Sequence, residues 1–373
     1  MLNPTFFLKE LQTIGITCFF GVPDSTLKHF CSFISSKLPK EQHTICVNEG
    51  VAISSAIGYH LATRKIPVVY MQNSGLGNSI NPLTSLVAKE IYSIPLLLLI
   101  GWRGEPDVKD EPQHIFQGRI TKSMLDTLEI PYDILDSESD MAKECTRIQQ
   151  FFLKNQSSYA LLVRKGTFSS SLADSNTTQE NKYTITREEA IQAIVDSGGS
   201  NSIIVSTTGM TSRELFETRE GKNQNHDTDF LTVGGMGCAS SIALGIARYC
   251  LGKQVICIDG DGAALMHMGA MGTIGALAPE NLLHIVINNG EHGSTGGQPT
   301  ISREIDLCNI AQSCGYEKVS RITAWVDLHD CIQKSVGKLS FIEIMTNNIY
   351  RKNLGRPTIS PIENKSAFMK NFD

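Results

Sequence analysis

The stretch VICIDGDGAALMHMG, residues 255–269, contains a short apolar run that ends in an acidic residue between two glycines, Gly260-Asp261-Gly262. Such a run predicts a buried strand. A carboxylate at the end of a buried strand is costly to remove from water unless a positive group lies beside it. A solvent-exposed turn is the alternative, and the rest of the sequence has to distinguish the two.

A second strand with a polar end follows. LLHIVI, residues 282–287, ends in Asn288-Asn289-Gly290. The span from Asp261 to Asn289 suits one strand–helix–strand unit of about thirty residues. Both polar ends are therefore expected at the carboxyl edge of one parallel sheet, where such folds bind ligands. Carboxylate, amide and carbonyl oxygens suit Mg²⁺ or Ca²⁺, and flanking glycines allow a sharp turn and a closely bound phosphate.

Other interpretations of the acidic stretch fit less well. An EF-hand loop starting at Asp259 would place Ala263 at a ligand position. A phosphatase nucleophile usually lies near the start of the chain. The pairs Gly75-x-Gly77 and Gly235-x-Gly237 lack the third glycine of a dinucleotide-binding fingerprint. A nicotinamide-dependent oxidoreductase therefore stays only as an alternative.

Composition limits the class of protein. The 373 residues suggest about two domains. A net charge of −5 does not indicate a broad basic surface, so no nucleic-acid partner is expected. No apolar run reaches the roughly 18 residues of a membrane span. No secretory signal is evident, so we expect a cytoplasmic protein. Ten scattered cysteines without a C-x-x-C pair favour free thiols over disulfides or zinc.

Two α/β halves are visible in the pattern of the chain. Short β-rich runs alternate with helical segments in both halves, which is typical of parallel sheets. A polar stretch separates them, and after it Thr186 and Glu189 form a capping-box pattern. We predict a first domain over residues 1–168, a linker over 169–183 and a second domain over 184–373.

At this point the residues resemble a known family. Gly260-Asp261-Gly262 followed by Asn288-Asn289 resembles the signature of thiamine diphosphate enzymes. The resemblance implies that Asp261, the Asn289 side chain and the backbone carbonyl of Glu291 hold Mg²⁺, which in turn binds the cofactor's diphosphate. It also implies cofactor contacts at Gly260, Gly262 and Ala263.

The resemblance assigns further cofactor contacts. Glu49 follows the run TICV and precedes a helix, where the family places the glutamate that protonates the cofactor's pyrimidine ring. A solvated glutamate at a helix start is the alternative. Met236 matches the residue that bends the cofactor, and the Gly234 carbonyl matches a contact to the aminopyrimidine. Thr208-Gly209 resembles a turn on the diphosphate side.

The order of the halves and the lack of a central domain resemble the compact phosphonopyruvate and sulfopyruvate decarboxylases. The stretches FGVPDSTL, YMQNSGLGNSINPLTSL, GWRGEPDVKDEPQHIFQGRIT, GGQPT and LGRPT carry this likeness. It implies an α/β fold of two parallel-sheet cofactor-binding domains, pyrimidine-binding then diphosphate-binding. It also implies a homo-oligomer with the cofactor between subunits.

The implied reaction is the thiamine diphosphate- and Mg²⁺-dependent decarboxylation of a 2-keto acid with an anionic tail. Single-chain fusion of the halves favours conversion of 3-phosphonopyruvate to phosphonoacetaldehyde and CO₂, in phosphonate biosynthesis. Sulfopyruvate decarboxylation and a non-catalytic cofactor-binding subunit are the alternatives. This chain has NGEHGS from Asn289 where such relatives commonly have NGAHES, so a catalytic role for the Glu291 side chain does not follow.

The remaining site residues have two interpretations each. Asp24 either steers protonation of the reacting carbon or caps the helix that begins there. His114 and His292 are proton donors or substrate contacts, or ordinary loop histidines. An anionic tail requires cationic or amide donors, and the candidates are Ser25, Asn73, Gly75, Arg103 and Arg356, with surface ion pairs as the alternative role of the arginines.

Overall fold

A computed structural model describes residues 1–170, 182–199, 201–325, 328–335, 337–351 and 353–372. The described residues form two compact units. One contains residues 1–170 with 292–299, and the other contains 182–291 with 300–372. Most of the predicted linker, 169–183, lies outside the described residues, so the proposed domain boundaries stay a prediction.

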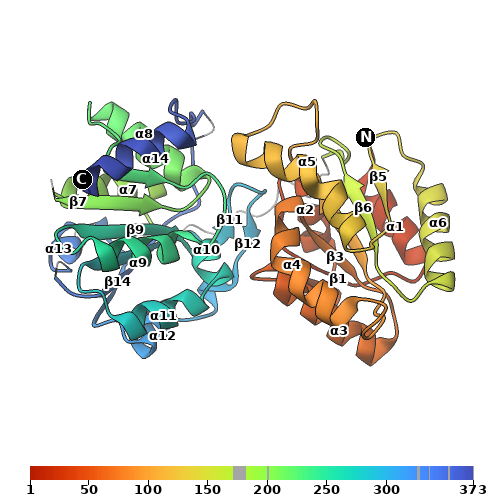
Figure 1. The fold of residues 1–373 in the computed structure, drawn as a ribbon. Coiled ribbons are helices and arrows are strands. Elements are labelled where there is room, and N and C mark those ends of the chain that lie inside the picture. Colours follow the sequence, from red (N-terminus) through yellow and green to blue (C-terminus); the bar gives the residue numbers. More distant parts are fainter. Residues whose placement is uncertain (171–181, 200, 326–327, 336, 352, 373) are drawn as a thin grey trace. The chain divides into compact units, whose positions relative to one another are not determined.

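The first unit is built on a six-stranded parallel sheet in the order β2-β1-β3-β4-β6-β5 (Figure 1). Its strands are β1 (Phe19–Gly21), β2 (His43–Ile45), β3 (Val68–Gln72), β4 (Leu97–Gly101), β5 (Tyr132–Leu135) and β6 (Tyr159–Val163). Its helices are α1 (Pro4–Thr13), α2 (Lys28–Lys37), α3 (Glu49–Thr63), α4 (Leu76–Pro82), α5 (Pro112–Thr127) and α6 (Met141–Lys154), with short turns η1 (Asn73–Gly75) and η2 (Leu83–Val87).

Helices cover both faces of this sheet. Leu97 and Leu99 of β4 pack in one buried cluster with residues of α1, α2 and α6. Leu98 and Ile100 pack in a second cluster with α3, α4 and α5. Both faces are buried, which explains why β4 is apolar at every position instead of alternating.

The second unit repeats this architecture with the strand order β13-β14-β10-β9-β7-β8, again parallel. Its strands are β7 (Ser202–Ser206), β8 (Asp229–Leu231), β9 (Gln254–Gly260), β10 (Leu282–Asn288), β13 (Lys318–Ile322) and β14 (Ser340–Met345). Its helices are α7 (Arg187–Ser197), α8 (Met210–Gly221), α9 (Ala239–Tyr249), α10 (Asp261–Met266), α11 (Gly269–Leu277), α12 (Leu307–Cys314), α13 (Leu328–Gln333) and α14 (Pro361–Met369). Its smaller elements are η4 (Ile301–Arg303) and η6 (Lys370–Phe372), while β11 (Glu291–His292) and β12 (Gln298–Pro299) form a two-stranded sheet whose residues 292–299 belong to the first unit.

The two-sheet α/β prediction is confirmed. The chain from Gln254 to Asn288 forms the expected strand–helix–strand unit, β9 to β10, with its helical part divided into α10 and α11. The capping box at Thr186 and Glu189 is also present at the start of α7. No third sheet domain occurs among the described residues.

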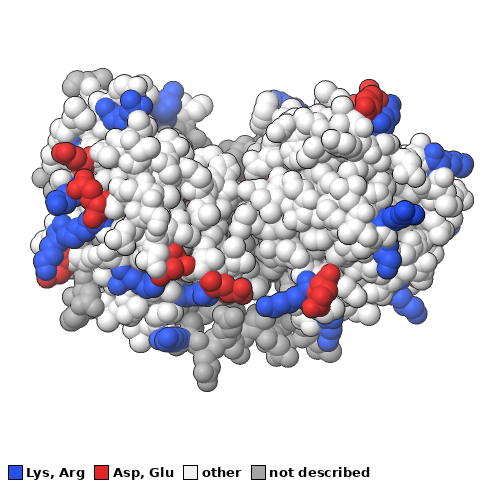
Figure 2. All heavy atoms as spheres, turned by 90° about the horizontal axis from the view of Figure 1, so that it is seen from below, with Lys and Arg blue, Asp and Glu red and all other residues white. Residues whose placement is uncertain are grey.

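Each sheet has a point where the strand order reverses direction, between β1 and β3 in the first unit and between β7 and β9 in the second. Crevices for ligands form at the carboxyl ends of strands at such points. In the part of the chain that the structure describes, no helix is both long and apolar enough to cross a bilayer. On the face drawn in Figure 2, lysines and arginines are interspersed with acidic and uncharged residues.

Candidate active site

Asp261 lies at the reversal point of the second sheet, as the first residue of α10 directly after β9. Its side chain is buried. The hydroxyls of Thr300 and Ser302 both donate to its Oδ2, the latter at 2.7 Å. Burial raises the pKa of the Asp261 carboxyl, although these hydroxyls, the Gly262 amide and the charge of Arg303 oppose the rise. A buried carboxylate held on one oxygen in this way fits a divalent cation on its other side.

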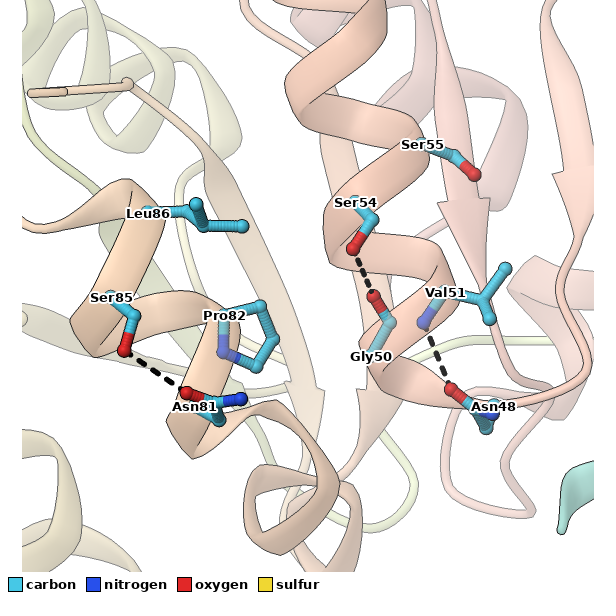
Figure 3. Close-up of a pocket in the computed structure, with 9 residues that line it drawn as sticks. All are labelled: Asn48, Gly50, Val51, Ser54, Ser55, Asn81, Pro82, Ser85 and Leu86. Carbon is cyan, nitrogen blue, oxygen red and sulfur yellow. Dashed lines mark hydrogen bonds between the residues drawn. The ribbon is translucent and has the colours of Figure 1, made fainter. Parts of the chain in front are cut away.

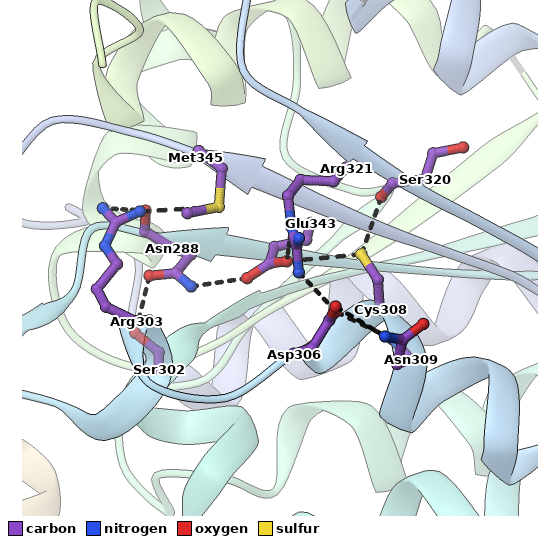
Figure 4. Close-up of polar contacts among 10 residues, drawn as sticks. All are labelled: Asn288, Ser302, Arg303, Asp306, Cys308, Asn309, Ser320, Arg321, Glu343 and Met345. Carbon is purple, nitrogen blue, oxygen red and sulfur yellow. Dashed lines mark hydrogen bonds and ion pairs between the residues drawn. The ribbon is translucent and has the colours of Figure 1, made fainter. Parts of the chain in front are cut away.

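The two asparagines at the end of β10 have different surroundings. Asn288 is buried and faces the neighbouring strand, where its amide donates to Glu343 Oε1 at 2.7 Å. Figure 4 shows it between Ser302 and Glu343 in a buried polar network that continues to Arg321. Asn289 is half-buried, and its Oδ1 accepts a hydrogen bond from the Glu291 amide at 3.2 Å. Of the two, Asn289 is the one left at the sheet edge.

Glu291 brings a second carboxyl toward this edge. Burial and the nearby charge of Asp261 raise the pKa of the Glu291 carboxyl. The Asn348 side-chain amide, which donates to Oε2 at 3.2 Å, lowers it. Arg187 also acts on it electrostatically. The Glu291 carboxyl is therefore close enough to Asp261 for the two charges to interact.

The other residues of this unit that the sequence predicts as cofactor contacts lie in loops that follow strands. Thr208 and Gly209 follow β7, and Gly209 has φ +88°, a conformation that favours glycine. Gly234 and Met236 lie between β8 and α9. A Cβ on Gly237 in the same loop would come within 3.0 Å of the Ala263 carbonyl, so this loop packs directly on α10.

Space remains around the first glycine of the acidic stretch. A Cβ built on Gly260 would meet no heavy atom within 4 Å, and its φ of −102° is one that any residue adopts. Neither packing nor backbone geometry of the described residues therefore requires glycine there. Close approach of a ligand is a physical reason for it.

Glu49 is buried as the first residue of α3 in the first unit. The preceding Asn48 caps the helix by accepting from the Val51 amide at 2.9 Å. Asn78 donates to Glu49 Oε2 at 2.8 Å. Gly75, which the sequence suggested as a substrate contact, lies against this glutamate, and a Cβ on it would come within 2.5 Å of Glu49 Cγ and Oε1.

A groove of about 690 Å³ opens beside this glutamate (Figure 3). It lies between α3 on one side and α4 with η2 on the other. Its lining is mostly small and polar: Asn48, Gly50, Val51, Ser54, Ser55, Asn81, Pro82, Ser85 and Leu86. The start of α3 therefore borders an open surface.

Asp24 and its partners occupy the reversal point of the first sheet. Asp24 is fully buried after β1, and its Oδ1 accepts from the amides of Thr26 at 2.8 Å and Leu27 at 3.2 Å. Gln72, at the end of β3, donates to Oδ2 at 2.7 Å. The carboxylate thus holds the turn before α2, whose N-cap residue is Leu27 and not Asp24, and it also links β1 to β3.

Arg103 lies beside this group, after β4. Its Nε donates to Asp110 Oδ2 at 2.8 Å, its Nη2 donates to the other oxygen of that carboxylate, and its Nη1 donates to Ser25 Oγ at 2.7 Å. Burial alone raises the pKa of Asp110, but Arg103 and two backbone amides hold it well below its usual range. The Asn73 side chain fixes the backbone of Arg103. Its Oδ1 accepts a hydrogen bond from the Arg103 amide at 3.2 Å, and its Nδ2 donates to the Arg103 carbonyl at 2.8 Å.

The other predicted residues are more scattered. His114 is half-buried on α5; burial and the charge of Arg103 lower its pKa, and its Nδ1 has no hydrogen-bond partner among the described residues. Burial lowers the pKa of His292 on β11 to about 4. Arg356 is exposed in the second unit.

The sequence of this chain is similar to those of known thiamine pyrophosphate enzymes. The N-terminal TPP binding domain of thiamine pyrophosphate enzymes matches residues 5–127, and the C-terminal TPP binding domain matches residues 205–344. The chain is 32% identical to a phosphonopyruvate decarboxylase of Streptomyces viridochromogenes, over 97% of its own length and 93% of that protein. The chain belongs to this family of thiamine pyrophosphate decarboxylases.

Two further relatives are similar over nearly their whole length. A phosphonopyruvate decarboxylase of Streptomyces hygroscopicus is 31% identical over 97% of this chain and 92% of its own. A sulfopyruvate decarboxylase of Methanosarcina acetivorans is 29% identical over 100% of this chain and 98% of its own. As a member of this family the chain is a carboxy-lyase that uses thiamine pyrophosphate, the compound called thiamine diphosphate above.

Several residues of these sites were not found from the sequence. Three polar residues that hydrogen-bond to predicted residues were missed: Asp110, Gln72 and Asn78. They lie on loops, or on elements other than those of their partners, and no periodic pattern marks them. Thr300 and Ser302, which hold Asp261, follow it by 39 and 41 residues. The GGQPT motif, whose last residue is Thr300, was the one signal that pointed to that segment.

Proposed function

We propose that this enzyme decarboxylates 3-phosphonopyruvate to phosphonoacetaldehyde and CO₂, with Mg²⁺ as its metal ion, in phosphonate biosynthesis. The buried Asp261 carboxylate is the observation that supports binding of Mg²⁺ and the cofactor. Two hydroxyls hold it on one oxygen at the carboxyl edge of the sheet. The two phosphonopyruvate decarboxylases at 31–32% identity support the substrate part.

In the second unit, Asp261, Asn289 and the Glu291 carbonyl would hold Mg²⁺, and Thr208, Gly209 and the glycines around Asp261 would line the diphosphate. The Gly234 carbonyl and Met236 would contact the rest of the cofactor. Bound thiamine diphosphate supplies the electron sink that loss of CO₂ from a 2-keto acid requires. The protein's part is to bind, orient and exclude water.

Glu49 would exchange a proton with the pyrimidine ring. Its carboxyl is buried, oriented by Asn78 on one oxygen and confined by Gly75. A positioned carboxyl in such a site contributes about 10²–10⁴-fold to rate as an acid or base. Asp24, His114 and His292 are the further candidates for proton transfer near the substrate.

Arg103 is the residue of the first unit best suited to the anionic tail. Asp110 holds its guanidinium in a fixed plane and Asn73 fixes its backbone. Its remaining N–H groups and the Ser25 hydroxyl are donors of the kind that an oxyanion group needs. We therefore assign Asn73 and Asp110 to positioning, with Arg356 as a separate candidate.

We further propose a cytoplasmic homo-oligomer in which residues of two subunits complete each cofactor site. The resemblance implies this arrangement, and the groove beside α3, with Val51 and Leu86 exposed, is available to a second chain. Light scattering of the purified protein tests it. An active monomer would contradict it.

The substrate is tested by parallel assays with 3-phosphonopyruvate, sulfopyruvate and pyruvate, each with thiamine diphosphate and Mg²⁺. We expect the highest kcat/KM with phosphonopyruvate, with the aldehyde detected by a coupled reaction. A preference for sulfopyruvate, the name of the Methanosarcina acetivorans relative, would assign the second candidate function. Cofactor binding without turnover of any keto acid would indicate a non-catalytic subunit.

A further inference from the structure

Three buried side chains in the core of the second unit have no role in the reaction described above. Cys257 and Asp259 lie two residues apart on β9, and His284 on β10 is paired with Cys257 across the sheet. Ile256 and Ile258 pack in the cluster on the opposite face. The sulfur, carboxylate and imidazole atoms of the three residues all lie within 4.8 Å of one another.

The hydrogen bonding of this group is incomplete. Among the described residues, Asp259 Oδ2 and His284 Nε2 are buried without a hydrogen-bond partner. They are 3.6 Å apart, which is too long for a hydrogen bond. Asp259 is completely buried, and its other oxygen accepts from the adjacent Gly260 amide at 3.0 Å. A carboxylate in this position is stabilised by a positive partner, either through an ion pair with His284 or through a cation between the two atoms.

The geometry favours the cation. Two ligand atoms on one tetrahedral zinc ion are separated by about 3.3–3.7 Å, close to the spacing of Asp259 Oδ2 and His284 Nε2. The other ring nitrogen, Nδ1, lies 3.1 Å from the Tyr316 hydroxyl. A metal-binding histidine usually has such a partner on its second nitrogen, which orients the ring and leaves the first nitrogen free to coordinate.

We propose that Cys257, Asp259 and His284 bind one transition-metal ion of the zinc type inside the second unit. Sulfur, imidazole and carboxylate donors suit zinc, whereas the oxygen donors around Asp261 suit magnesium. Coordination replaces the thiol proton, which is released to solvent. Burial and the charge of Asp259 raise the pKa of the metal-free Cys257 thiol, so without the ion this residue is a neutral thiol.

The ion would link β9 to β10 close to the point where β9 leads into Asp261 and β10 ends at Asn288. Its expected effect is therefore structural, on the two loops that carry the cofactor's metal. The sequence pattern did not indicate this site because its ligands come from two strands and lack the short cysteine spacing of common zinc sites.

The first test uses the unmodified protein. The whole chain is treated with a chelator, saturated with Mg²⁺ and thiamine diphosphate to fill the Asp261 site, and titrated with Co²⁺. We expect one equivalent to bind and to produce a thiolate-to-cobalt charge-transfer band. The band should persist in Asp261→Ala. Absence of the band, with no metal retained by the purified protein, would show that Asp259 and His284 form only an ion pair.

Variants identify the ligands. Cys257→Ser should lose the band and weaken Zn²⁺ binding about a hundredfold or more, whereas Cys250→Ser, a half-buried thiol at the end of α9, should match the wild type. Tyr316→Phe should keep the band and lower zinc affinity about 10–100-fold. Circular dichroism checks that each variant folds. Equal zinc binding by folded Cys257→Ser and wild type would overturn the proposal.

Discussion

Gly75 lies directly against the carboxyl group of Glu49: a Cβ built on this glycine would be 2.5 Å from Glu49 Cγ and 2.5 Å from Oε1. The φ of Gly75 is −69°, so its backbone does not require glycine. The space that the glycine leaves is therefore occupied by the glutamate. This contact gives a way to displace Glu49 without changing its chemistry.

Gly75→Ala is expected to displace the Glu49 side chain by about an ångström and to lower kcat by about 10²-fold, the cost typical of such a misplacement. Steady-state kinetics with saturating cofactor measures the effect. Gly77→Ala is the matched control, since Gly77 lies two residues along in α4 and a Cβ there meets nothing within 4 Å. Equal losses in both variants would mean that the contact with Glu49 is not the cause.

Glu49→Gln replaces the carboxyl group, which exchanges the proton with the cofactor, and keeps the shape of the side chain. We expect kcat to fall by about 10²–10⁴-fold, while the thermal midpoint and the secondary structure stay close to wild type. Decarboxylation at near wild-type rate would exclude Glu49 as the proton-exchanging group. Asn78→Ala, which removes only the hydrogen bond to Oε2, should give a smaller loss.

Arg103→Lys should raise KM for phosphonopyruvate by about 10–100-fold and change kcat less, because an ammonium cannot reproduce the planar donors of a guanidinium. Pyruvate, which has no anionic tail, should be nearly unaffected. Arg119→Lys serves as control, since Arg119 lies over the Phe116 ring on α5. A similar KM change for both substrates would indicate that Arg103 does not contact the tail.

The ion pair of Arg103 with Asp110 predicts a pH-dependent stability. The folded-state pKa of Asp110 lies well below its usual range, so its stabilising effect is complete above the unfolded pKa of about 4 and declines as the pH falls toward the folded value. Asp110→Asn should therefore unfold more easily than wild type at pH 7, by about 1–3 kcal/mol. Denaturation at pH 7 and below pH 4 measures this, and the difference should shrink in acid. A difference independent of pH would point to lost packing.

The fold and part of the site were predictable because strand ends in a parallel sheet meet at one edge. That reasoning placed Asp261 and the asparagines together. It could not determine that Asn288 turns to Glu343 on β14 while Asn289 stays at the edge, because a shift of one residue reverses the direction of a strand side chain. Likewise Gly75 was expected to face substrate, and its contact with Glu49 depends on how η1 packs on α3.

Residues on irregular loops that pair with the site residues could not be predicted from the sequence either. The position of Asp110 opposite Arg103 depends on the path of residues 104–110, which no periodicity describes. The group of Cys257, Asp259 and His284 required the register of β9 and β10.

Binding of thiamine diphosphate tests the central claim most directly. Calorimetric titration of the chelator-treated protein should show saturable binding that depends on added Mg²⁺. Asp261→Ala should abolish it, and Asp196→Ala, at a surface ion pair with Lys222, should leave it unchanged. If the wild-type protein shows no Mg²⁺-dependent binding of the cofactor, or if Asp261→Ala binds it as tightly, the assignment of this site is wrong.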